Sequence, residues 1–147
     1  MPQPRVEGQG GLNILLVEDD DVDLMSVRRA LNGRPAPHTV TVARDGREAL
    51  AILRGEDGRP PLRSPYVILL DLNLPLLNGL EFLRELRRDP AHHRAVVFVL
   101  TTSDAERDRH AAYDQNVAGY VVKSTLGHHF GPMLDLLEAY ARVVSLP

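Results

Sequence analysis

The sequence contains no cysteine. This absence excludes disulfides, thiolate zinc sites and cysteine nucleophiles, and it is typical of proteins of the reducing cytoplasm. The sequence also carries no net positive charge: its formal net charge is -3 and its isoelectric point is about 6.0. This balance argues against a nucleic-acid-binding surface. No apolar run approaches the ~20 residues that span a bilayer, so we expect no membrane partner.

The composition is that of a soluble globular domain. Apolar residues make up 44% and charged residues 25% of the 147 residues, which is enough to bury one core but too little for two ordinary domains. Residues 1–11 lack the apolar centre of a signal peptide and predict a flexible N-terminal tail. We therefore expect a single cytoplasmic domain over residues 12–147.

Apolar runs alternate along the chain with segments of helical spacing. The runs predict strands over residues 12–17, 38–43, 67–70, 95–100 and 118–122. The spacing predicts a helix that ends at Asn32-Gly33 and further helices over residues 46–53, 79–88, 104–116 and 132–144. Strict alternation indicates an α/β fold with a parallel sheet covered by helices on both faces.

Polar residues follow four of these strands directly: Glu18 and Asp19, then Asp71, Thr101 and Lys123. The carboxyl ends of parallel strands meet at one edge of a sheet, so these residues should converge. Three neighbouring carboxylates repel one another, and a bound divalent cation relieves the repulsion. Oxygen ligands without histidine or cysteine favour Mg²⁺.

An Mg²⁺ site, a lysine and a nucleophilic aspartate together describe a phosphoryl-acceptor site, in which attack by Asp71 gives an acyl phosphate. The alternative is that each acid caps a helix and that Lys123 is a surface charge. It requires independent coincidences at four strand ends.

The segments LLVEDD, LLDLNLPLLNG, VLTTS and GYVVKS resemble, in order and spacing, the bacterial response-regulator receiver domain. The resemblance covers residues 12–144. It implies a flavodoxin-like, doubly wound five-stranded sheet of order 2-1-3-4-5 with five helices. One position departs from the family, in which a proline in a cis bond usually follows the lysine. Here the residue is Ser124, so either the loop is rebuilt or a strained cis bond is kept.

The resemblance also implies roles for the acidic residues. Asp71 corresponds to the phosphoryl acceptor and Asp19 to the direct Mg²⁺ ligand. Glu18 would act on the metal through water, and the backbone carbonyl of Asn73 would complete the protein's share of the ligands. Such a protein is no enzyme beyond phosphotransfer to its own aspartate and self-dephosphorylation.

The remaining motif residues resemble the parts that read out phosphorylation. Thr101 corresponds to the switch hydroxyl, Tyr120 to the switch aromatic and Lys123 to the phosphoryl-binding cation. Thr102 is bulkier than the small residue usual at its position, so we expect it to hinder attack by water and to slow self-dephosphorylation.

A narrower resemblance concerns the small response regulators that partner phytochrome-type, light-sensing histidine kinases. It is carried by Lys123-Ser124, the Thr-Thr-Ser segment, the Ser-Leu-Pro terminus and the long loop over residues 55–65. It implies a phytochrome-type kinase as partner. Only 24 residues follow Lys123, so we expect a stand-alone receiver without an output domain, acting on a downstream protein target.

Two other functions are alternatives to this switch. An Mg²⁺-dependent phosphatase of the haloacid-dehalogenase type needs a carboxylic acid two residues after its nucleophile, and Asn73 cannot supply acid–base catalysis. A phosphorylation-independent binding scaffold would not need the complete site.

The last helix carries more apolar surface than a sheet can cover. Met133, Leu137, Tyr140 and Val144 form one stripe, while a second stripe of Leu136, Ala139 and Val143 lies beside it. We predict a two-fold homodimer through this helix, with interface residues Met133, Leu136, Tyr140 and Val143. The resemblance extends this interface to the fourth helix and the fifth strand.

Three other side chains have simpler expected roles. Tyr113 and Phe130 are predicted to lie in the core. Arg87 is predicted to lie on the solvated face of its helix, with Arg84 and Arg88.

Overall fold

The computed structural model describes residues 11–127 and 129–147, so the tail predicted for residues 1–11 lies outside the described residues except for Gly11. Its centre is a five-stranded parallel sheet of order β2-β1-β3-β4-β5. The strands are β1 (Asn13–Val17), β2 (Thr39–Ala43), β3 (Tyr66–Leu70), β4 (Val96–Thr101) and β5 (Gly119–Val122). The predicted topology is confirmed.

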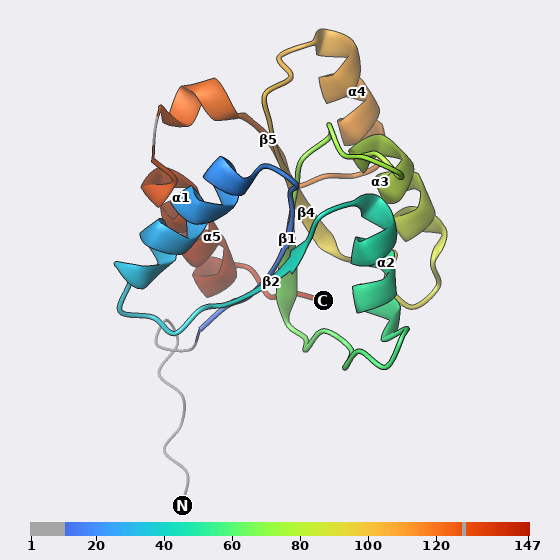
Figure 1. Ribbon diagram of the computed structural model, residues 1–147, viewed down its shortest axis with the longest axis horizontal. Coiled ribbons are helices and arrows are strands. Elements are labelled where there is room, and N and C mark those ends of the chain that lie inside the picture. The colour runs from blue at the N-terminus through green and yellow to red at the C-terminus, as the bar shows by residue number, and fades with distance from the viewer. Residues whose placement is uncertain (1–10, 128) are drawn as a thin grey trace, which may run out of the picture.

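Helices cover both faces of the sheet. They are α1 (Asp21–Asn32), α2 (Gly46–Arg54), α3 (Gly79–Arg88), α4 (Glu106–Asp114) and α5 (Gly131–Val143), with a short 3₁₀ helix η1 (Lys123–Leu126) after β5. Figure 1 shows α1 and α5 on one side of the sheet and α2, α3 and α4 on the other. None of the helices within the described ranges combines the length and the hydropathy that crossing a membrane requires.

The core lies in two layers, one on each side of the sheet. Successive residues of a strand point to opposite faces, so a strand between two helical layers must be apolar throughout. In β3, Val67 and Leu69 pack with α1 and α5, whereas Ile68 and Leu70 pack with α2 and α3. All four are completely buried or nearly so, which explains the uninterrupted apolar run.

Side chains cap the beginnings of α1, α2 and α3. Asp20 is the N-cap of α1, and its Oδ1 accepts the backbone N–H of Val22 at 2.8 Å. Asn78 and Glu81 form a reciprocal capping box at α3. Because Asp20 fills the capping position of α1, its acidic neighbours Glu18 and Asp19 are left for another role.

Two predictions about side chains are wrong. Tyr113 is 48% exposed, because the outer face of α4 has no further layer to cover it. Arg87 is half-buried rather than on a solvated face: its guanidinium donates hydrogen bonds of 2.7–3.1 Å to the backbone carbonyls of His93, Ala95, Gln115 and Asn116. Arg87 therefore joins the end of α3 to the segments before β4 and β5, and burial lowers its pKa. Phe130 is buried, as predicted.

The structure also corrects the expected exposed face of α5. Met133 is only 2% exposed and packs in the core, so it cannot contribute to an interface with another copy. Tyr140 is half-buried, with its ring edge-on to Phe98. Leu136 and Val143 are exposed at 42% and 79%. Val144 follows the last residue of the helix and is 38% exposed rather than sheet-facing.

We predict that Arg87→Ala lowers the free energy of unfolding by about 3 kcal/mol, because four backbone carbonyls, two of them part-buried, lose a charged donor. Arg88→Ala is the matched control, since Arg88 is a neighbouring arginine whose side chain is 74% exposed and whose nearest carboxylate, on Glu85, lies 3.6 Å away. It should change stability by no more than about 0.5 kcal/mol. Urea denaturation measures both, and equal losses would show that the carbonyl contacts of Arg87 do not stabilise the fold.

Candidate functional site

The predicted acidic residues meet at the carboxyl edge of the sheet. The N–H of Asp71 donates to the carbonyl of Val17 at 3.0 Å, which places the end of β3 directly beside the end of β1. Ligand oxygens of Glu18, Asp19 and Asp71 all lie within 4.8 Å of one another. Glu18 and Asp71 are buried, at 3% and 6% exposed, whereas Asp19 faces solvent.

This donor set fits a hard divalent cation. Its side-chain ligands are carboxylate oxygens, and neither nitrogen nor sulfur belongs to the cluster. Such cations prefer several oxygen ligands and keep part of their water shell, which the exposed side of Asp19 permits. Asp19, Glu18 and Asp71 are the side chains that would hold the ion.

The loop after β3 fixes the position of Asp71. Its Oδ1 accepts the backbone N–H of Asn73 at 3.1 Å, and Gly79 donates its N–H to the carbonyl of Leu72 at 3.0 Å. A Cβ at Gly79 would clash with the backbone of Asp71 and Leu72, so this close approach requires glycine. The carboxylate therefore sits on a closed loop rather than on a free end.

Lys123 lies among carboxylates. Its Nζ donates to Asp23 Oδ2 at 2.6 Å, to Glu18 Oε2 at 2.7 Å and to Asp71 Oδ2 at 3.2 Å. Burial raises the pKa of Glu18 to about 7, with a contribution from the charge of Asp71, and the hydrogen bond from Lys123 opposes this rise. Burial disfavours charge on Lys123 as well, but the hydrogen bonds to Asp23 and Glu18 outweigh it and raise the pKa of the ammonium. Lys123 is therefore a charged partner for this acidic edge.

Ser124 changes the loop after Lys123. The Lys123–Ser124 peptide is trans, and within the described residues the cis peptide bond is at Ser64–Pro65. The chain passes from β5 straight into η1, where the N–H of Gly127 donates to the carbonyl of Ser124 at 3.3 Å. Of the two alternatives, the loop is rebuilt and no strained bond is kept.

The hydroxyl residues after β4 have separate environments. Thr101 is fully buried at the strand end, and its Oγ1 accepts the N–H of Ser103 at 3.4 Å. Thr102 is exposed and accepts a hydrogen bond from Asn73 Nδ2 at 3.3 Å, which brings it to the rim of the site. The phenol of Tyr120 donates to the carbonyl of Ser103 at 2.9 Å.

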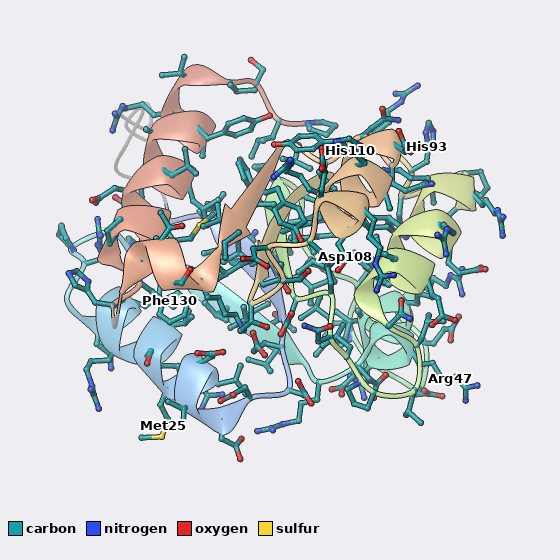
Figure 2. All side chains as sticks on the ribbon, turned by 90° about the horizontal axis from the view of Figure 1, so that it is seen from above. Met25, Arg47, His93, Asp108, His110 and Phe130 are labelled. Atoms are coloured by element: carbon teal, nitrogen blue, oxygen red, sulfur yellow. The ribbon has the colours of Figure 1, made fainter. Side chains whose placement is uncertain are left out.

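Two residues of this region were not predicted. One is Asp23, and the sequence did hold a signal for it: Asp23 lies one helical turn before the buried Val27, which places it on the sheet-facing side of α1. Met25, nearby on the same helix, points outward instead (Figure 2) and is 60% exposed. The other is Asp108 on α4, which accepts a hydrogen bond from the hydroxyl of Ser103 at 2.6 Å.

Comparison with known proteins matches this arrangement to a family. The family model described as the response regulator receiver domain matches residues 14–129. The chain belongs to this family. The expectation drawn from the four sequence segments is thereby confirmed.

Three comparisons match over nearly the whole length of both proteins. Response regulator Rcp1 of the cyanobacterium Synechocystis is 37% identical over 135 residues, which cover 91% of this chain and 92% of Rcp1. The crystal structure of the phosphorylated cyanobacterial phytochrome response regulator RcpA superposes with a TM-score of 0.83 at 38% identity, covering 93% of this receiver and 99% of RcpA. The Mn²⁺-bound form of Rcp1 gives a TM-score of 0.79 at 36% identity, with 92% and 99% covered. The narrower resemblance to phytochrome response regulators is confirmed.

Proposed function

We propose that this receiver is the phosphorylated switch of a two-component pathway and that it accepts a phosphoryl group from a sensor histidine kinase on Asp71. The observation that carries the proposal is the position of this carboxylate. It ends the central strand, is nearly buried, and has one oxygen fixed by the N–H of Asn73 and the other 3.2 Å from the ammonium of Lys123. A carboxylate oriented in this way is suited to attack a phosphorus atom.

In the proposed reaction, a carboxylate oxygen of Asp71 forms a bond to phosphorus while the bond from phosphorus to the donor's nitrogen breaks. The ammonium of Lys123 binds the negative charge on the transferred group. Mg²⁺ would be held by Asp19 and Asp71, by the backbone carbonyl of Asn73, and by Glu18 through water. When bound, the metal neutralises charge on the phosphoryl oxygens.

We further propose a conformational response to phosphorylation and slow self-dephosphorylation. Thr101, buried beside the site, is proposed to move toward the phosphoryl group, and Tyr120 to respond from β5. Hydrolysis of the acyl phosphate needs a water molecule in line with the bond to phosphorus. The hydrogen bond between Asn73 and Thr102 places two side chains at the rim of the site, which supports hindered self-dephosphorylation.

The proposed partners follow from the relatives. RcpA is a cyanobacterial phytochrome response regulator. By analogy we propose that a phytochrome-type histidine kinase donates the phosphoryl group to this receiver. We propose that the receiver over residues 12–147 works in the cytoplasm and acts on another protein, with no role in nucleic-acid or membrane binding. The phosphatase alternative is weakened further, because the amide of Asn73 occupies the position where that chemistry needs an acid.

Asp71→Asn is expected to leave a folded protein that accepts no phosphoryl group, because an amide is a poor nucleophile. Incubation with acetyl phosphate and Mg²⁺, followed by intact-mass measurement, should give one phosphoryl adduct on the parent and none on the variant. An adduct of equal yield on the variant would place the acceptor elsewhere. Steady release of phosphate from added phosphomonoesters by the parent would favour the phosphatase instead.

Asp19→Ala should weaken Mg²⁺ binding roughly tenfold or more, because even indirect partners of a metal ligand contribute that much to affinity. Asp114→Ala is the control, since it removes a charge from an exposed position at the end of α4. Calorimetric titration of the three proteins with Mg²⁺ measures the difference. Unchanged affinity of the Asp19 variant would refute its assignment as a direct ligand.

We also propose a two-fold homodimer through the exposed face of α5, together with α4 and β5. With Met133 excluded by its burial, the supporting residues are Leu136 and Val143, two exposed apolar side chains on one helix, with Tyr140 at their edge. Exposed apolar side chains gathered on one element are more typical of an interface than of a free surface.

The parent protein should sediment as a dimer at tens of micromolar, and Leu136→Glu with Val143→Glu should sediment as a monomer, because two charges would be buried without partners. Met25→Glu, the same change on an exposed residue of α1, should leave the dimer intact. A monomeric parent, or a dimer that survives both substitutions on α5, would contradict the proposal.

A further inference from the structure

Lys123 is held by carboxylates of two kinds. Glu18 and Asp71 belong to the cluster that fits a divalent cation. Asp23 does not belong to it, yet it makes the shortest of the three contacts, 2.6 Å from Nζ. The lysine is thus anchored at one point outside the cation cluster and at two points within it.

Occupation of the site changes the two inner contacts. A cation drawn in by Glu18, Asp19 and Asp71 competes with the ammonium of Lys123, because Glu18 and Asp71 are carboxylate partners of the lysine and members of the cation cluster as well. A phosphoryl group on Asp71 uses one of its carboxylate oxygens altogether. Neither cation binding nor phosphorylation of Asp71 involves the carboxylate of Asp23. This carboxylate can therefore keep the ammonium of Lys123 in place while Glu18 and Asp71 bind the cation or carry the phosphoryl group.

The surroundings of Asp23 leave it free for this role. The N-cap of α1 is already supplied by Asp20, and the neighbouring Asp21 pairs with Arg44 at 2.9 Å on the surface. The side chain of Asp23 is 24% exposed, against 77% for Asp21. Lys123 is the only lysine in the sequence, so no other ammonium can replace it.

We propose that Asp23 is a positioning residue, whose carboxylate anchors the ammonium of Lys123 from α1 and keeps it directed at the phosphoryl group on Asp71. This inference rests on the proposed function for its consequence, but the anchoring itself does not require phosphorylation. Without the anchor, the flexible four-carbon chain of the lysine loses its fixed geometry once a cation takes the inner oxygens.

The single lysine permits a direct test. Protein grown with ¹³C,¹⁵N-lysine gives one side-chain signal set in NMR spectra, that of Lys123. In Mg²⁺, without any phosphoryl donor, the two Hε protons of the parent should be inequivalent, as for an immobilised side chain. In Asp23→Asn they should collapse toward the signals of a mobile lysine. Asp21→Asn removes the same charge from the same helical turn and should match the parent, and Asp23→Glu should keep part of the inequivalence.

The consequence is measured with beryllium fluoride, a mimic of the phosphoryl group, at saturating Mg²⁺. Asp23→Asn should weaken its binding roughly tenfold, as for the loss of one charge-assisted hydrogen bond, while Asp21→Asn should change it less than about twofold. An equal effect of both substitutions would mean a general loss of charge and would overturn the proposal. So would a Lys123 signal that Asp23→Asn leaves unchanged.

The outcomes separate the two proposals. If the parent binds neither beryllium fluoride nor a phosphoryl group while Lys123 becomes mobile only in Asp23→Asn, the proposed function fails and the anchoring stands. If the parent is phosphorylated normally and Lys123 stays immobilised in Asp23→Asn, the function stands and the anchoring role is refuted.

Discussion

The repulsion among carboxylates at one edge of the sheet is the constraint on which the rest of the site depends. Glu18 and Asp71 are nearly buried, where an unpaired carboxylate costs several kcal/mol. Their counter-charge, Lys123, follows β5, far along the chain from both. The compensation therefore exists only when β1, β3 and β5 are assembled. The charged edge and the fold require each other.

Most of the fold could be predicted from the sequence, because a strand buried on both faces leaves a continuous apolar run and an amphipathic helix leaves a spaced one. The strand predicted over residues 67–70 is β3 without its first residue, Tyr66, and the end of α3 was marked by the segment before Pro90. The failures have a common cause. Arg87 and Tyr113 sit on helices whose outer faces look alike in sequence, and only the packing of α3 and α4 decides which one is covered. Met133 was wrongly predicted at the dimer interface. Helical spacing shows which residues of α5 share a face, but it does not show which of these faces the sheet covers.

The candidate site was predictable where it follows from strand ends. Glu18, Asp19, Asp71, Thr101 and Lys123 each come directly after an apolar run, so parallel strands alone bring them together. Asp23 was not found: its helical spacing from Val27 indicates the sheet-facing side of α1, but its contact with Lys123 after β5 depends on tertiary packing. The sequence did not decide the conformation of the loop at Ser124 either, because serine lacks the cis preference of proline and allows several conformations. In the structure the chain passes directly into η1, which selects one of them.

The segment after β4 shows how a change at Asp71 could reach a surface. Thr101 is buried beside the strand ends, Thr102 is bonded to Asn73, and Ser103 contacts both Tyr120 on β5 and Asp108 on α4. Three successive residues thus join the acceptor loop to two elements of the proposed dimer face. The helix they reach is weakly held, because α4 has no side-chain cap and buries only Ala112. An element with few buried contacts is displaced at low cost in free energy. A movement of Thr101 would therefore be carried to α4 rather than absorbed in the tightly packed strands around it.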